Sequence, residues 1–391
     1  MKLIKFASRP NMKYLVHLII WTFVQDITQD SIGLIFAFNL ELTYLLLSFL
    51  AELIFGGIVY LYQLKTIEKK SSTRNNFFIG IKLITNDKIK IYDSKGKIYF
   101  LIIIATFFDF ISFLIYILLA KNFIYCSSTL GKRLRGILII FDAFFYRYIL
   151  KLEIFKHQRF SLLVMSICLI ITIATEFIFQ DVDIFLRHGE FALVLVIFII
   201  DVFFCSLVDL IEKYLFEYDY VNPFKVIMLE GVFGLCFGIG YSFFASFFIS
   251  VKYYYDNCGP AEFAYLILSL ILYLVLSGVQ DMFRVVTIKI YSPMASSLSE
   301  FFLNPIYIIF SLFLENDFIH NKKRNYLYFS INIILTIIIS LCGCVYNEFL
   351  ILFFWGLQHE TYKEISYRAA LPHDNFELYD INDCEDEETN I

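Results

Sequence analysis

The sequence predicts an all-α polytopic membrane protein with about ten transmembrane helices, arranged as two inverted five-helix repeats. Composition predicts the membrane location: 59% of the 391 residues are hydrophobic and the mean hydropathy is +0.70, which is too apolar for a soluble protein. The apolar runs have the length of about 20 residues that a helix needs to cross the hydrocarbon. A pair of similar motifs in the two halves predicts the repeat.

Ten apolar runs, each bounded by charged or turn residues, are the predicted spans. We expect the first run to be a membrane helix and not a signal peptide. Its basic start is followed by Gln25, Asp26, Gln29 and Asp30 and not by a small-residue cleavage site. The predicted spans are residues 14–38, 42–64, 98–120, 133–151, 160–180, 189–213, 224–250, 262–289, 294–315 and 326–349.

The loops that connect these spans differ in their content of Lys and Arg, which sets the predicted orientation. Basic residues gather at the N-terminus and in the long loop 65–97, and the alternate loops hold fewer of them. Only residues 322–324 go against this pattern. Because cytoplasmic loops carry the excess of Lys and Arg, we expect both ends of the chain to be cytoplasmic. We expect the membrane to be that of an intracellular organelle.

The domain organisation follows from the spans and from the composition of the C-terminal part. Residues 1–180 form the predicted first repeat, with the cytoplasmic loop 65–97, and residues 189–349 form the second. Residues 350–371 would place apolar residues on one side of a helix and Glu360, Lys363 and Arg368 on the other, which predicts an amphipathic helix on the cytoplasmic face. Residues 372–391 contain eight acids and no Lys or Arg, so we expect a disordered acidic tail.

Two internal matches predict the repeat. The segments "AELIFGG" (51–57) and "LEGVFGL" (229–235) share the pattern Glu-x-x-Phe-Gly, each in the second span of its half. The segments "LRGILIIFDAFF" (134–145) and "LNPIYIIFSLFL" (303–314) also match at equivalent places. Five spans is an odd number, so the second copy enters the membrane inverted. Inverted repeats are the architecture of many secondary transporters, with the binding site near the midplane.

The carboxylates inside these motifs are candidate site residues, because an ionisable side chain in the bilayer usually faces the protein interior or a cavity. Glu230 shares a helix face with Gly234 and Gly238, and Glu52 shares one with Gly56. We expect both carboxylates to point at a partner helix or a cavity. Either they bind cargo or a proton, or they only hold helices together.

The third and eighth spans add further polar candidates. Asp109 lies on one helix face with Ser112 and Tyr116 and lines either a cavity or a packing contact. The eighth span carries a polar stripe at helical spacing, which comprises Ser277, Gln280, Asp281, Arg284 and Thr287. Arg284 either neutralises Asp281 or binds an anionic group of the cargo.

The sixth span holds two aspartates that face alike. They are Asp201 and Asp209, and we expect Asp209 to pair with Lys213 at i+4.

Four longer segments resemble a known family. Residues 107–151 contain Asp109, Tyr116, Asn122 and a Ser-rich turn before Leu-Arg-Gly, and "EGVFG" (230–234) forms a second motif. Residues 284–302 and 344–365 contain a helix-to-helix turn and a Tyr-Asn-Glu exit. Together these segments resemble the drug/metabolite transporter superfamily, in particular the F-type members of solute carrier family 35, over most of residues 98–366. The chain departs from the pattern in its more basic "GKRLRG" turn and in Gln280, where relatives often have Asn.

The resemblance implies a ten-helix solute carrier, and the cargoes of the superfamily range from nucleotide sugars to small organic cations and metabolites. We therefore expect a secondary-active transporter of a small polar organic solute that works by alternating access. The expected substrate-binding residues are Glu52, Asp109, Glu230, Gln280 and Arg284. The alternative is a non-transporting scaffold or regulatory subunit that retains the fold.

Other classes of function find no support in the sequence. The six histidines form no cluster, and the eight cysteines lie mostly in apolar runs without zinc-ligand spacing. Motifs for nucleotide binding or nucleophilic catalysis are missing as well. We therefore expect no enzyme activity, no cofactor, no metal and no nucleic acid. The expected partners are a small-molecule substrate and the lipid bilayer, and a homodimer is compatible with the sequence.

Overall fold

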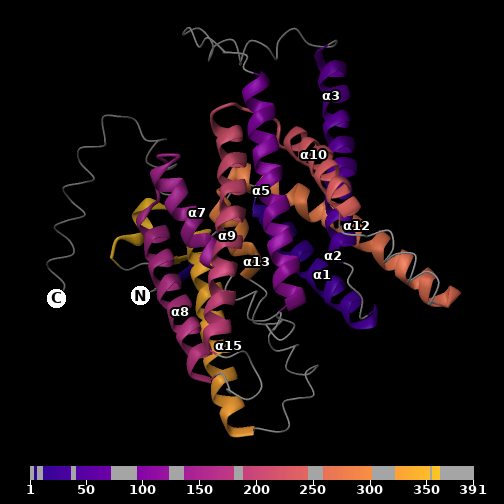
Figure 1. Ribbon diagram of the computed structural model, residues 1–391. Coiled ribbons are helices and arrows are strands. Elements are labelled where there is room, and N and C mark those ends of the chain that lie inside the picture. The colour runs from indigo at the N-terminus through magenta and orange to yellow at the C-terminus, as the bar shows by residue number, and fades with distance from the viewer. Residues whose placement is uncertain are drawn as a thin grey trace, which may run out of the picture.

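The computed structural model describes residues 4–6, 12–36, 41–71, 95–122, 136–179, 188–244, 259–301, 322–352 and 355–361. Within these ranges the chain is almost entirely helical (Figure 1). The helices of the first half are α1 (Met12–Phe36), α2 (Glu41–Ala51), the π-helix η1 (Glu52–Gly56), α3 (Gly57–Ser71), α5 (Lys95–Asn122), α7 (Gly136–Tyr148) and α8 (Lys156–Phe179). Those of the second half are α9 (His188–Glu217), α10 (Pro223–Phe244), α12 (Pro260–Ile290), α13 (Pro293–Phe301) and α15 (Lys322–Tyr346).

The helices confirm the prediction of an all-α membrane protein. Each of the ten predicted spans overlaps one of these helices, although most of the span 294–315 lies outside the described residues. Several helices are long and apolar enough to cross a membrane, and Ser330–Tyr346 is a shorter apolar helix. The five membrane-length segments within the described residues are Leu42–Thr66, Gly96–Ile115, Lys156–Thr175, Pro223–Phe243 and Glu262–Ile290.

Proline fixes the start of three helices in the second half. Pro223, Pro260 and Pro293 are the first residues of α10, α12 and α13. Proline suits this position because the first backbone N–H of a helix has no intrahelical acceptor, and the ring sets a helical φ. Short connections precede two of these helices, from α9 to α10 and from α12 to α13. These two connections keep the consecutive helices close to one another at one end of the molecule.

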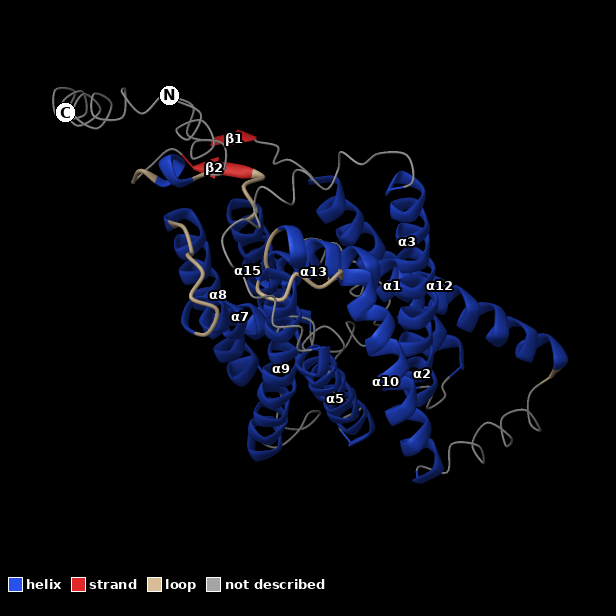
Figure 2. Cartoon of the chain, turned by 90° about the horizontal axis from the view of Figure 1, so that it is seen from above, coloured by secondary structure: helices blue, strands red, loops and turns tan. Residues whose placement is uncertain are grey.

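The helices form two packed groups, with α5 and α9 between them (Figures 1 and 2). In the first group, α7, α8, α13 and α15 share a core that includes Ile139, Met165, Met294 and Ile339. In the second group, α10 packs against α2, η1 and α5, and α12 packs against α1, α2 and η1. Each group contains helices from both halves of the chain. Other extensive contacts join α5 to α9, α7 to α9, and α1 to α13.

The π-helix and α10 cross at a point where the two Glu-x-x-Phe-Gly motifs meet. A Cβ atom on Gly231 would overlap the backbone of Leu53 and lie 2.6 Å from the carbonyl oxygen of Phe49. Gly234 accommodates the Phe49 ring, and a Cβ on Gly56 would lie 3.1 Å from Cγ2 of Ile227. Without side chains at these glycines the two backbones approach closely, as small residues allow in membrane helices.

The contacts at this crossing are reciprocal. Phe49 and Ile227 each stand three residues before the Glu of their own motif, and each packs on the final Gly of the other motif. The predicted shared faces are also confirmed: Glu52 and Gly56 are both buried, and so are Glu230, Gly234 and Gly238. The second internal match is not comparable, because residues 303–314 lie outside the described residues.

A short antiparallel sheet joins a segment that precedes the first helix to a segment that follows the last one. Strand β1 (Ile4–Phe6) pairs with β2 (Leu350–Leu352), which follows α15 (Figure 2). The prediction of a continuous amphipathic helix over 350–371 is wrong at its start, because the pairing with β1 holds residues 350–352 extended. A 3-10 helix (Leu357–Glu360) follows. The remainder of that predicted helix, from residue 362, and the acidic tail lie outside the described residues.

The crossing predicts opposite effects of alanine at two glycines of α10. Gly231→Ala should destabilise the protein by about 2 kcal/mol, because the new methyl group forces the η1 and α10 backbones apart. Gly240→Ala on the same helix meets nothing within 4 Å and should be neutral or stabilising by up to about 1 kcal/mol. Thermal unfolding of the purified proteins in detergent measures both. Equal unfolding temperatures for the two variants would contradict the close crossing.

Candidate functional site

Two buried carboxylates lie at the crossing of η1 and α10. Glu52 is 7% exposed and Glu230 is 5% exposed, and the two carboxylates interact electrostatically. Among the described residues, Oε2 of Glu52 and Oε1 of Glu230 have no hydrogen-bond partner. Buried polar atoms are nearly always paired, so unpaired carboxylate oxygens at one place point to a ligand, a proton or water. The π-helix also favours a functional site here, because single π-helical turns inserted in α-helices are frequent at functional sites.

Helix α12 brings hydroxyl and carboxylate groups to the same place. Ser277 donates to Oδ2 of Asp281 at 3.3 Å, and its hydroxyl lies 3.4 Å from that of Ser48 on α2. One turn of α12 is held against η1 because Gly278 leaves room for the ring of Phe55. Asp281 therefore lies within electrostatic range of Glu52 and Glu230.

Arg284 is clamped by two acids of α9. Its guanidinium donates from Nη2 to Oε1 of Glu212 at 2.7 Å and from Nη1 to Oε2 at 3.1 Å, which is a bidentate pair. Nη1 also donates to Oδ1 of Asp209 at 3.1 Å. Asp281 is farther away, with 3.9 Å from Nε of Arg284 to Oδ1. The guanidinium therefore has its main partners on α9, and Asp281 is a secondary one.

The carboxylate site is the name used below for these groups together with Asp109 of α5, which interacts electrostatically with Glu52, Glu230 and Asp281. It contains six carboxylates and one guanidinium. Among the described residues its members are Glu52, Asp109, Asp209, Glu212, Glu230, Asp281 and Arg284. The excess of acids favours a ligand that carries positive charge, or protons on several of the carboxyl groups.

Four of the five predicted site residues come together here. They are Glu52, Asp109, Glu230 and Arg284, which lie within electrostatic range of one another. The fifth, Gln280, turns toward α1, where its Nε2 donates to Oγ1 of Thr22 at 3.2 Å. Gln280 thus contacts the helix next to the site and holds α12 against it.

The prediction that Asp209 pairs with Lys213 is wrong. Asp209 pairs with Arg284, and Lys213 pairs with Glu217 at 2.7 Å. The Asp209 carboxylate faces Arg284 on the neighbouring helix α12, and Lys213 takes the other acid at i+4 within α9, Glu217. Asp201, which lies about two turns before Asp209 on α9, accepts a hydrogen bond of 2.5 Å from Ser112 of α5. The side chain of Tyr116 does not belong to the described part of the chain.

Sequence reasoning missed Glu212, which is fully buried and makes the shortest contact with Arg284. It stands next to Lys213 near the end of a predicted span and resembles an ordinary interfacial charge. A usable signal is its spacing: Asp209 and Glu212 lie at i and i+3 and therefore share one helix face. The π-helix at Glu52–Gly56 was missed as well, since no residue pattern in that segment marks it.

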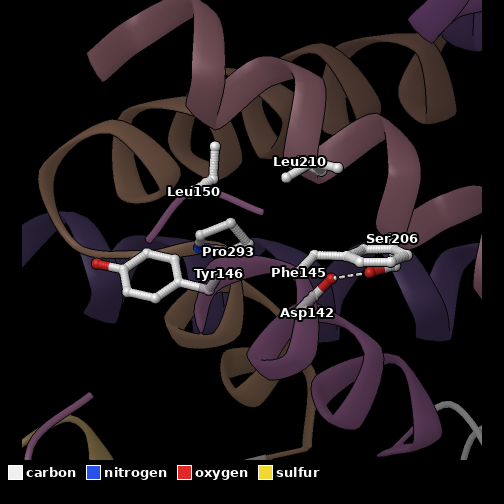
Figure 3. A pocket seen from close by; sticks show the side chains of 7 residues that line it. All are labelled: Asp142, Phe145, Tyr146, Leu150, Ser206, Leu210 and Pro293. Atoms are coloured by element: carbon white, nitrogen blue, oxygen red, sulfur yellow. Dashed lines mark hydrogen bonds between the residues drawn. The ribbon is translucent and has the colours of Figure 1, made fainter. Parts of the chain in front are cut away.

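A second polar group lies between α7, α9 and α13, and Figure 3 shows two of its members, Asp142 and Ser206, with the hydrogen bond between them. Asp142 accepts hydrogen bonds from Ser206 at 2.6 Å and from Ser297 at 3.0 Å. Phe145, Leu210 and Pro293 line the crevice beside it, which is too narrow for a water molecule. This group ties three helices together and leaves no room for cargo.

The described residues contain no group of three or more His, Cys, Asp or Glu side chains arranged to hold a metal ion. The carboxylates of the site come from five different segments, η1, α5, α9, α10 and α12. They surround the crossing as separate groups, each within electrostatic range of others.

The clamp on Arg284 predicts a stability effect. Glu212→Gln should destabilise the protein by about 3 kcal/mol, because removing one charge of a buried pair leaves the other partly uncompensated. Glu153→Gln removes an exposed charge and should change stability by less than about 0.5 kcal/mol. Thermal unfolding in detergent compares the two. A Glu212 variant as stable as the Glu153 variant would show that the clamp is dispensable.

Comparison with known proteins adds no family assignment to this geometry. No protein-family model matches the chain, and no curated protein matches it.

Proposed function

We propose that the protein is a secondary-active transporter with two inverted five-helix repeats, which moves a small polar organic solute across the membrane by alternating access. The observation that carries the proposal is the pattern of helix contacts. The first repeat comprises α1, α2 with η1 and α3, α5, α7 and α8. The second comprises α9, α10, α12, α13 and α15, in the same order.

The main contacts are preserved when each helix is exchanged for its counterpart in the other repeat. The contact of α5 with α9 becomes that of α12 with α1, and both exist. The contact of α7 with α9 becomes that of α13 with α1, and the contact of α10 with α5 becomes that of α2 with α12. The pairs α2 with α10, α7 with α13, and α8 with α15 map onto themselves. This is the behaviour expected of a two-fold relation between halves.

The crossing of η1 and α10 lies on the proposed two-fold axis. In the aligned motifs the counterpart of Leu53 is Gly231, and these two residues are in contact. Glu52 and Glu230, which are also counterparts, lie beside them. Transporters with inverted repeats bind cargo near the midplane between the repeats, and the carboxylate site occupies that place in the proposed architecture.

The charge of the site narrows the class of cargo. Six carboxylates surround one guanidinium, and two of those carboxylates occupy the guanidinium fork. A diphosphate such as that of a nucleotide sugar would be repelled by the net negative charge of these groups. An organic solute with a positively charged nitrogen would meet Glu52, Glu230 and Asp281, whose charges desolvation makes costly without a partner. We therefore propose a cationic solute and not a nucleotide sugar.

Transport by the purified protein in liposomes tests the proposal. A panel of labelled quaternary ammonium compounds, polyamines and nucleotide sugars should give uptake of at least one cationic member. Glu230→Gln and Glu52→Gln should each lower that uptake by about tenfold or more, since a charged hydrogen-bond partner of the cargo is lost. Glu153→Gln, on the surface, is the matched control and should leave uptake unchanged.

Two results would contradict this function. If the folded wild-type protein transports no solute of the panel, and metabolite levels do not differ between cells with and without it, the scaffold alternative is favoured. If nucleotide sugars are transported and cations are not, the charge argument fails although transport stands.

A further inference from the structure

Helices α9 and α12 are joined at one end of the molecule by two successive charge contacts. The inner contact is the clamp of Asp209 and Glu212 on Arg284. The outer contact lies one turn further along α12, where Lys213, the residue after Glu212, reaches the C-terminal end of that helix. These contacts and the residues that make them are called the α9–α12 junction below.

Lys213 is 2% exposed, which is unusual for a lysine. Its ammonium donates to the carbonyl oxygens of Ile288 at 3.0 Å and of Lys289 and Tyr291 at 3.3 Å each. The last carbonyls of a helix have no intrahelical donor, and the helix dipole favours a positive charge there. Glu217 pairs with the same ammonium at 2.7 Å. Lys213 therefore binds the end of α12 to α9.

The α9–α12 junction is also where the two proposed repeats differ. Exchange of the repeats turns the contact of α9 with α12 into a contact of α1 with α5. In the part of the chain that the structure describes, α9 packs on α12, but α1 and α5 make no comparable contact. Likewise α12 packs on α13, whereas α5 and α7 lack a comparable contact within the described ranges. The two repeats thus share their framework and differ at these helices.

In transporters with inverted repeats, access alternates when one repeat rocks or gates against the other around a fixed site. With two-fold related repeats, an exchange of contacts between them would produce the second state. Contacts present in one repeat and missing from the other therefore mark the parts that move. We propose that the α9–α12 junction is the closed gate of the carboxylate site, latched by Lys213, and that it opens as α1 approaches α5. The proposal depends on the proposed transport function. Arg284 links the gate to the site, because the acids that hold the gate shut belong to the site.

Hydrogen exchange of the full-length protein in lipid nanodiscs, without cargo, tests the latch. Lys213→Met keeps the length of the side chain but removes its charge and its donors. Amides of residues 284–292 and 209–217 should then exchange on the order of tenfold faster, because the junction opens more often. Lys289→Met removes an exposed ammonium from the same end of α12, keeps the backbone carbonyl that Lys213 binds, and should leave the exchange unchanged.

A distance measurement separates a gate from a mere helix cap. Spin labels introduced as unnatural amino acids at Thr28 of α1 and Ile115 of α5 report on the opposite end of the molecule. With Lys213→Met the distance distribution should shift to shorter values, because α1 approaches α5 when the junction opens. If Lys213→Met does not fold, Glu217→Gln, at a position 42% exposed, replaces it and should give the same changes with smaller size.

Two outcomes overturn the gate. If the junction amides of Lys213→Met exchange hydrogen at the same rate as those of Lys289→Met, Lys213 does not act as a latch. If hydrogen exchange is faster but the distance between residues 28 and 115 does not shift, Lys213 only caps the end of α12, and its loss has a local effect. Both measurements are made without cargo, so a negative liposome assay would refute transport and leave their outcome unaffected.

Discussion

The close crossing of η1 and α10 is the constraint on which the rest of the structure depends. Glycines at 56, 231 and 234 allow the two backbones to touch, and this contact fixes where Glu52 and Glu230 lie. Helix α12 then packs against the outer side of the crossing, where Phe55 fills the space above Gly278. Packing is a main source of attraction between helices in a membrane, because lipid is as apolar as the side chains. The acids are thus held together by the glycines around them.

The accumulation of acids in an apolar interior is costly, and the protein compensates it only in part. Arg284 neutralises Glu212 and Asp209. Serine hydroxyl groups donate hydrogen bonds to the carboxylates of Asp281, Asp201 and Asp142. One carboxylate oxygen of Glu52 and one of Glu230 have no hydrogen-bond partner among the described residues. Buried polar networks with unsatisfied members are unfavourable for folding alone. Their presence at the crossing is what distinguishes this site from the fully satisfied group around Asp142.

Much of the fold could be predicted from the sequence, because the thickness of the bilayer sets the length of the apolar runs that form spanning helices. Every predicted span overlaps a helix, and the spacing of Glu230, Gly234 and Gly238 correctly placed them on one buried face. The partners of charges were harder to predict. Asp209 has a lysine at i+4 and yet binds an arginine of another helix, because helix–helix contacts decide which charges face each other. Glu212 escaped notice for the same reason, and so did the strand at 350–352, which exists only because residues 4–6 pair with it.

The crossing also affects how the chain is made. Glu52 enters the membrane with the second helical segment, but Gly231 and Glu230 are synthesised about 180 residues later. At usual rates of translation this interval is on the order of ten to forty seconds. During that time the first half of the protein carries a carboxylate in the bilayer without the helix that will enclose it. The nascent first half is therefore the stage at which quality-control factors that recognise polar groups within membrane helices have the best opportunity to act.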